Sequence, residues 1–220
     1  MSLILHPFWS QENLKSMIER KCENIEVIKK DTLYKKFFRV EEYFFKYPRY
    51  DGKMSAPVSR EVMDRGNSAG ILLYDPDKEK LVFVEQMRVG VFIAGEYPWV
   101  LECAAGMVDP GETPQQVVIR EAKEEAGAEV LSVEPIVEYF ASPGGITEKL
   151  FLFCGRVNAD QVAEYAGLPS ENEDIHIVVL SVEEAEKMLA EGKFNNALTI
   201  IAVQWFLMNK EKLRKKWGMS

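Results

Sequence analysis

The sequence has few of the residues on which several common chemistries depend. Its 220 residues include two histidines and three scattered cysteines, Cys22, Cys103 and Cys154, with no C-x-x-C pair. A disulfide framework and a cysteine zinc site are therefore not indicated, and histidine-rich zinc chemistry is excluded. Free cysteines are typical of a reducing compartment, so we expect a cytoplasmic protein.

Long apolar runs and basic stripes are missing as well. The longest apolar stretch, residues 197–208, is interrupted by Thr199 and Gln204 and falls short of the roughly 20 residues that a membrane span needs. The first residues lack the basic start of a secretory signal. Acidic residues outnumber basic ones by 35 to 27, for a formal charge of −8, and the one Lys/Arg run is C-terminal. We therefore expect neither a membrane nor nucleic acid as a partner.

The first 66 residues are rich in aromatic side chains. Eight of the chain's 24 aromatic residues lie between Asp31 and Tyr50, which predicts a strand and a neighbouring strand before the Asp51-Gly52 turn. About 60 residues cannot build a large core of their own. The aromatic faces therefore pack either on the rest of the same chain or on a second subunit, and both interpretations remain open.

From residue 67 onward the pattern predicts strands on both sides of a helix, followed by terminal helices. Thr113, Pro114 and Gln116 form a capping box with a first-turn proline, and Gly127 ends that helix. This order indicates a mixed-sheet layer protein of the α/β or α+β class, and we expect α+β, after a small N-terminal β domain at residues 1–66. The predicted strands are 69–74, 81–84, 99–105, 136–141, 150–157 and 175–180, and the predicted helices are 114–126, 182–190 and 195–215.

Three glutamates crowd the end of the first helix. Glu121 and Glu125 stand four positions apart and repel each other, while Arg120 pairs at the same spacing with Glu124. Alone, such a cluster is typical of a solvated helix face. It also suits a hard divalent cation such as Mg2+, which takes one or two carboxylates together with phosphate oxygens of a substrate.

With its flanks, this helix forms the pattern Gly106-x5-Glu112-x7-Arg120-Glu121-Ala122-Lys123-Glu124-Glu125-Ala126-Gly127-Ala128. The pattern resembles the Nudix hydrolase signature, G-x5-E-x7-R-E-U-x-E-E-x-G-U, where U is a bulky aliphatic residue. It departs from the signature only by alanine at both U positions. The resemblance implies an α/β/α sandwich with a mixed sheet, in which Mg2+, or Mn2+ as an alternative, is bound beside a nucleoside diphosphate derivative. The implied metal ligands are Glu121, Glu125 and the carbonyl of Ala105, and Glu124 is implied either as a further ligand or as a neighbour that orients the ligands.

Other stretches narrow the resemblance to bacterial ADP-ribose pyrophosphatases. Ser142-Pro143-Gly144-Gly145 follows the signature at the spacing of that group, and Glu85-Gln86-Met87-Arg88 and Glu171-Asn172-Glu173-Asp174-Ile175 are similar to its members. The resemblance implies that Glu171 is the general base and that Glu173 is an additional metal ligand. It also implies a homodimer with swapped N-terminal domains, 1–66, beside the hydrolase domain, 67–220.

The implied substrate contacts come from both parts of the chain. Arg88 and Arg65 are the candidates for phosphate binding, and Phe37 or Phe38 for stacking on adenine, although core packing explains these two aromatics equally well. Arg60 and Glu61 would arrive from the other subunit, and Glu148 would approach the metal and phosphate. The residues implied to line the pocket are Met107, Ser142, Pro143 and Gly144.

The function expected from this resemblance is Mg2+-dependent hydrolysis of ADP-ribose to AMP and ribose 5-phosphate. A GDP-mannose hydrolase and a nucleotide-sensing module without catalysis are the alternatives. A further rival is the nucleophile elbow G-x-S-x-G at residues 66–70, which requires a strand before Ser68 and a helix after it. The residues after Ser68 predict a hairpin strand instead.

Overall fold

The computed structural model describes residues 24–218, which form two compact units. The N-terminal unit comprises the chain up to Arg65 together with Ser142–Thr147, and the main unit comprises Gly66–Ala141 and the chain from Glu148 onward. The chain thus leaves the main unit after Ala141, contributes one short loop to the N-terminal unit, and returns to the main unit at Glu148. We describe each unit by itself.

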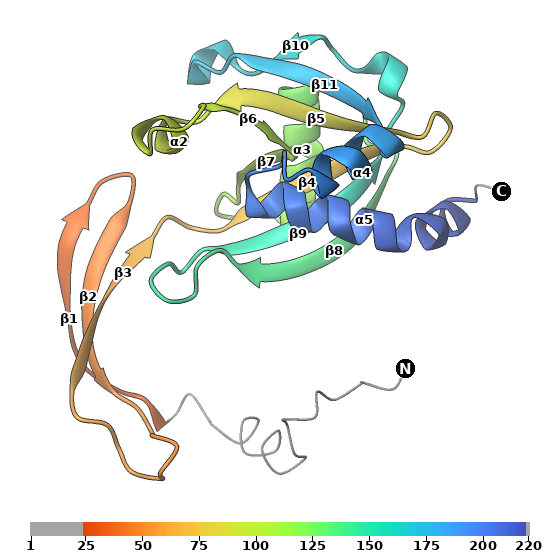
Figure 1. Ribbon diagram of the computed structural model, residues 1–220. Helices are drawn as coiled ribbons and strands as arrows, with labels where there is room; N and C mark the ends of the chain where they lie inside the picture. Colours follow the sequence, from red (N-terminus) through yellow and green to blue (C-terminus); the bar gives the residue numbers. More distant parts are fainter. Residues whose placement is uncertain (1–23, 219–220) are drawn as a thin grey trace. The chain divides into compact units, whose positions relative to one another are not determined.

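The N-terminal unit is a three-stranded antiparallel sheet in the order β1-β2-β3 (Figure 1). Backbone hydrogen bonds attach the loop at residues 142–147 to β3, with Met63 donating to Gly145 at 2.8 Å and Thr147 donating to Met63 at 3.0 Å. Every residue of β1 is exposed within the chain, as expected for a sheet too small to bury two faces. The strands are β1 (Glu26–Lys35), β2 (Arg39–Lys46) and β3 (Val58–Asp64).

The main unit is built on a mixed sheet in the order β10-β11-β5-β4-β9-β8. β4 and β9 pair in parallel, and the other pairs are antiparallel. Two short strands leave this path, because β6 pairs with β5 and β7 pairs with β4. The strands are β4 (Ser68–Asp75), β5 (Lys80–Met87), β6 (Trp99–Glu102), β7 (Ala104–Met107), β8 (Ser132–Phe140), β9 (Lys149–Arg156), β10 (Tyr165–Ala166) and β11 (Ile175–Ser181).

Helices cover both faces of this sheet, so the predicted α/β/α sandwich is confirmed (Figure 1). One core lies between the sheet and α3, and the other lies between the sheet and the helices α4 and α5. β4 is buried at all eight positions because it supplies side chains to both cores. The helices are α2 (Val89–Ile93), α3 (Pro114–Ala126), α4 (Val182–Ala190) and α5 (Ala197–Lys216), with short 3-10 turns at Ala159–Gln161 and Pro169–Glu171.

Most of the predicted elements are present. α3 has the predicted bounds, its Thr113 side chain and Gln116 form the capping box, and Gly127 ends it in the left-handed conformation at φ 60°. The two alanines of the signature's U positions, Ala122 and Ala128, are buried in the core beneath α3. Ser68 starts β4 and no helix follows it, so the structure rules out a nucleophile elbow there.

One predicted strand is wrong as a single element. The segment 99–105 forms two strands, because the chain changes partner at Cys103 from β5 to β4. α2, β3 and β10 were not predicted. No helix of the described residues is both long and apolar enough to cross a membrane.

Candidate active site

The carboxylates of α3 are brought against β7 by the fold. Glu121 and Glu125 lie on the helix face that packs on the sheet, and they are 9% and 3% exposed. The backbone N–H of Ala105 donates to Glu125 Oε2 at 2.8 Å. A Cβ atom at Gly106 would overlap the carboxylate of Glu121. The first glycine of the signature is therefore needed so that β7 can approach this helix closely.

Arg120 connects the loop before α3 to the glutamates on it. Its guanidinium donates to Glu121 at 2.7 Å and to Glu124 at 3.0 Å, and it pairs with Glu112 at 3.3 Å through two nitrogens. One cation therefore orients three carboxylates of the signature. Planar guanidinium groups are suited to such multiple contacts.

Burial controls the electrostatics of this cluster. Burial raises the pKa of Glu125 to about 8, and the hydrogen bond from Ala105 and the charge of Arg88 only partly oppose this shift. Burial also raises the pKa of Glu121, although Arg120 opposes it, and Glu124 and Glu173 add repulsion. Buried carboxylates that repel one another are stabilised by a bound cation.

The loop before β11 brings a further carboxylate to the cluster. The backbone N–H of Gly167 donates to the carbonyl of Glu124 at 3.1 Å, which fixes this loop on α3. Within the loop, Glu173 accepts a hydrogen bond from the Leu168 backbone at 3.1 Å, and its charge acts on both Glu121 and Glu125. Glu171 ends the 3-10 turn Pro169–Glu171 in the same loop. Its side chain lies outside the described part of the structure.

The donor set fits a hard divalent cation. It offers carboxylate oxygens that are buried and mutually repelling, on a helix and a loop that are held together. Among the side chains that the structure describes, to which that of Glu171 does not belong, no three of His, Cys, Asp or Glu already converge as a metal-binding group. Oxygens of Glu121 and Glu125 are instead hydrogen-bonded to Arg120 and Ala105. The assignment of the ligands therefore stays a prediction.

Two of the predicted substrate contacts in the main unit lie beside this cluster. Arg88 forms an ion pair with Glu102 at 2.5 Å, and its charge acts on Glu125. Met107 ends β7, two residues beyond Ala105. Sequence reasoning missed Glu102 and also Gln86, which donates to Glu125 at 3.4 Å. Because strand side chains alternate, the position of Gln86 two residues before Arg88 was the available signal.

Glu148 is held by a neighbour on β4. Ser68 Oγ lies 2.5 Å from Glu148 Oε1 and 3.4 Å from Met107 Sδ. Both Ser68 and Glu148 are less than a tenth exposed. Glu148 is thus fixed at the end of β7, and the serine of the rejected elbow helps to orient it.

The other predicted substrate contacts belong to the N-terminal unit. Phe37 and Phe38 lie in the bend between β1 and β2, with ring centroids 5.0 Å apart, and they are 75% and 38% exposed. Within one chain they are therefore not core residues. This contradicts the interpretation that they serve core packing and leaves the stacking on adenine as a prediction. The remaining predicted contacts of this unit, on β3, just after it, and in the attached loop, are Arg60, Glu61, Arg65, Ser142, Pro143 and Gly144.

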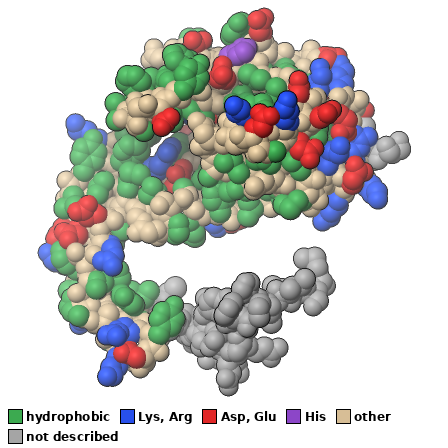
Figure 2. Space-filling model, viewed as in Figure 1, with side chains coloured by type: hydrophobic (Ala, Val, Ile, Leu, Met, Phe, Trp, Pro, Cys, Tyr) green, Lys and Arg blue, Asp and Glu red, His purple; other side chains and the backbone are tan. Residues whose placement is uncertain are grey.

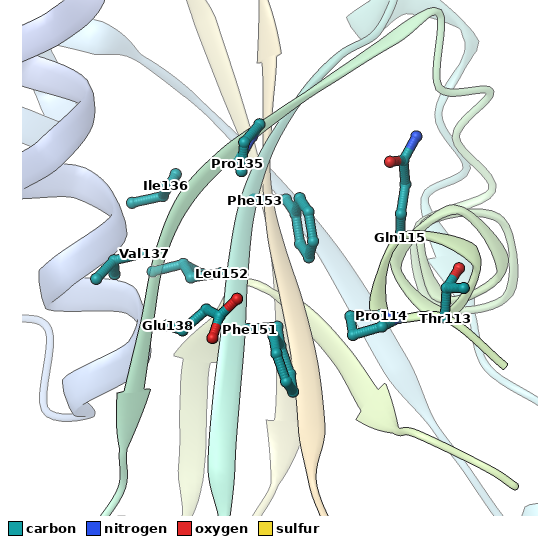
Figure 3. A pocket seen from close by; sticks show the side chains of 10 residues that line it. All are labelled: Thr113, Pro114, Gln115, Pro135, Ile136, Val137, Glu138, Phe151, Leu152 and Phe153. Carbon is teal, nitrogen blue, oxygen red and sulfur yellow. The ribbon is translucent and has the colours of Figure 1, made fainter.

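A cavity of about 560 Å³ lies elsewhere in the main unit. Figure 3 shows Phe151 and Phe153 projecting from β9 toward the start of α3, where Pro114 lies. Its lining includes a single charged side chain, Glu138, and none of the predicted site residues. It is therefore not the candidate active site.

Comparison with known proteins assigns the chain to a family. The NUDIX domain model matches residues 64–203, which is more than half of the chain. The chain belongs to the Nudix family. Its signature helix is α3, and members of this family generally use a divalent metal.

Curated Nudix relatives extend the similarity over nearly the whole chain. The ADP-ribose pyrophosphatase of Escherichia coli K12 is 39% identical over 195 residues, covering 89% of this chain and 93% of that protein. The ADP-ribose pyrophosphatase of Haemophilus influenzae is 36% identical, covering 97% and 99%. The GDP-mannose pyrophosphatase of Yersinia pestis is 35% identical, covering 84% and 91%. These relatives act on nucleoside diphosphate sugars.

A solved structure supports the Nudix fold independently. The crystal structure of an ADP compounds hydrolase aligns with a TM-score of 0.67 at 18% identity, covering 90% of this chain and 97% of that one. At this identity the similarity shows the fold alone.

Proposed function

We propose that this Nudix protein hydrolyses the pyrophosphate bond of ADP-ribose to AMP and ribose 5-phosphate, with Mg2+ as its cofactor. The observation that carries the proposal is the buried Glu121 and Glu125 pair, with Glu173 fixed close enough for its charge to act on both. The ADP-ribose pyrophosphatases at 36–39% identity support the choice of substrate, because they cover most of the chain.

Each residue of the cluster has a role in this proposal. Glu121, Glu125 and Glu173, with the Ala105 carbonyl and Glu124, would hold the metal. When bound, Mg2+ supplies neutralisation of the charge on the pyrophosphate oxygens and orientation of a water molecule. Glu171 takes a proton from the attacking water, and its place in a loop lets it approach when the substrate is bound. Arg88 and Arg65 bind phosphate oxygens, and Glu148 and Met107 border them.

The N-terminal unit completes the proposed site from a second subunit. All ten residues of β1 are exposed within the chain, and α2 has no buried residue. Figure 2 shows hydrophobic side chains at the surface over the region of α2. Such apolar surfaces are typical of interfaces. We propose a homodimer with swapped N-terminal units, in which Phe37 or Phe38 stacks on adenine and Arg60 and Glu61 come from the other subunit.

Two buried thiols support a reducing location. Cys103 and Cys154 are both free, and burial raises the pKa of the Cys103 thiol to about 12. Neither is a disulfide partner in the described chain. A cytoplasmic enzyme suits this thiol usage.

A substrate panel tests the proposed reaction. Purified protein with Mg2+ is given ADP-ribose, GDP-mannose, NADH and diadenosine polyphosphates, and the products are identified. We expect AMP and ribose 5-phosphate at the highest kcat/KM, and loss of turnover in chelator. GDP-mannose is the second candidate, because a GDP-mannose pyrophosphatase is 35% identical. If no compound is hydrolysed while ADP-ribose binds, the protein is a sensor and the proposal is wrong.

A further inference from the structure

Arg88 is held by a carboxylate that the family signature does not contain. Its Nε donates to Glu102 Oε2 at 2.5 Å. The Glu102 side chain is 16% exposed and that of Arg88 is 43% exposed, so the pair lies at the edge of the buried site. A charge-assisted hydrogen bond of this length is stronger than one between neutral groups.

Strand pairing explains how the two residues meet. In the β5-β6 register Glu102 lies opposite Val84, and the Arg88 backbone extends the pairing by donating to Pro98 at 2.8 Å. Residues directly opposite share a face of an antiparallel pair, and alternate residues along a strand do so too. Arg88 and Glu102 therefore occupy one face of β5-β6, and the arginine extends back along it.

This face of β5-β6 contacts the carboxylate cluster of α3. Gln86 lies on it between the two residues, and its amide donates to Glu125 at 3.4 Å. The charge of Arg88 also acts on Glu125. The ion pair thus holds the partly exposed guanidinium at the edge of the site, where its charge acts on Glu125.

The contact with Glu102 uses only one part of the guanidinium. The Nε atom is the donor, and neither terminal nitrogen has a hydrogen-bond partner among the described groups of residues 24–218, which do not include the Glu171 side chain. Two parallel N–H groups of an arginine match two oxygens of one phosphate group. The pair thus leaves the phosphate-binding side of Arg88 available.

We infer that Glu102 is a positioning residue, which holds Arg88 by Nε so that its two terminal nitrogens bind a phosphate group of the substrate. This inference rests on the proposed function for the substrate, a nucleoside diphosphate sugar. In this inference Glu102 makes no contact of its own with the substrate or the metal. It acts through Arg88 alone.

A double-mutant cycle tests this coupling. Glu102→Ala, Arg88→Ala and the double variant are compared with the parent protein in ADP-ribose hydrolysis with Mg2+. Each single change is expected to raise KM by roughly tenfold to a hundredfold with little change in kcat, because binding to phosphate is lost in ground and transition state alike. In the Arg88→Ala background, Glu102→Ala should add less than about twofold. Glu102→Gln keeps an oxygen acceptor and should restore part of the affinity.

The test includes a control variant and has defined outcomes that would contradict the inference. Glu96→Ala removes an exposed glutamate shortly before β6 and should leave KM unchanged. Equal losses from Glu102→Ala in both backgrounds, or an unchanged KM, would overturn the inference. If Glu102→Ala lowers the melting temperature enough to unfold the protein, the nearly isosteric Glu102→Gln is measured in both backgrounds with the same criteria.

A binding measurement separates this inference from the proposed reaction. Calorimetric titration with pyrophosphate in the presence of Mg2+ needs no turnover. If the protein hydrolyses no nucleoside diphosphate sugar, the proposed function fails, while the pyrophosphate affinities still test the ion pair. A weaker affinity of Glu102→Ala than of the parent, absent in the Arg88→Ala background, supports the inference, and equal affinities overturn it.

Discussion

Glu125 is the most buried carboxylate on α3, and its titration links metal binding to stability. Burial raises its pKa to about 8, whereas the unfolded chain has a value of about 4.3. Between about pH 5 and pH 8 the metal-free folded protein therefore keeps a proton that the unfolded chain has lost. The contribution of Glu125 to stability is therefore largest below this window and falls as the pH rises through it.

Substitution of Glu125 by glutamine should remove this dependence. In chelator, we expect the denaturation midpoint of the parent protein to fall from pH 5 to pH 8 and that of Glu125→Gln to change much less. The variant should also lose metal-dependent turnover. Glu129→Gln, an exposed glutamate just beyond the helix, is the matched control. An equally steep pH dependence in Glu125→Gln would show that another group titrates.

Glu171 is predicted to act on the attacking water rather than on the fold. Glu171→Gln keeps the shape of the side chain and removes its basicity, so kcat should fall by about 10²- to 10⁴-fold with KM nearly unchanged. Steady-state kinetics on ADP-ribose measures this. Glu164→Gln, an exposed glutamate earlier in the same connection, should remain active. Turnover near the parent value in Glu171→Gln would assign the base elsewhere.

The sequence predicted some site residues and missed others for a physical reason. Glu121 and Glu125 were identifiable because their spacing on one helix is local. Glu102 acts on Arg88 across a strand pair, fourteen positions along the chain. Such a contact depends on strand register, which side-chain pattern alone did not reveal.

At the scale of elements, the close packing of β7 against α3 depends on the absence of a side chain at Gly106. A Cβ there would meet the carboxylate of Glu121. Gly106→Ala should displace one of the two, lowering stability by about 1–3 kcal/mol and reducing kcat as Glu121 moves. Thermal denaturation and kinetics report both effects. Gly90→Ala, where an added Cβ meets nothing within 4 Å, should be neutral, and a neutral Gly106→Ala would refute the close approach.

Local and distant signals also explain which elements were predictable. α3 was correct to the residue because its capping box and its C-terminal glycine are local signals. The sequence pattern of segment 99–105 predicts one strand, because both halves of the segment are extended. Its division at Cys103 comes from a change of partner between β5 and β4, which is a property of the assembled sheet.

At the scale of the whole molecule, a layered protein with a mixed sheet was predictable, and the environment of the N-terminal aromatic residues was not. The order of strands and helices implies layers around one sheet. Aromatic residues in a strand, by contrast, suit a core and an interface equally well. Phe37 is exposed within one chain, so it is not part of a core there. What covers it is therefore a question about assembly.

The proposed dimer predicts that the active protein has twice the 25.1 kDa mass of the chain. Phe92 and Ile93 on α2 are 56% and 76% exposed, and a lysine at either position should weaken an apolar interface there. We expect Phe92→Lys and Ile93→Lys to sediment partly as monomers at micromolar concentration and to show a raised KM for ADP-ribose that recovers as protein concentration rises. Met208→Lys, at a 77% exposed site on α5, should remain dimeric. A parent protein that sediments as a fully active monomer would disprove a site shared between subunits, and the roles proposed for Arg60 and Glu61 would then fall with it.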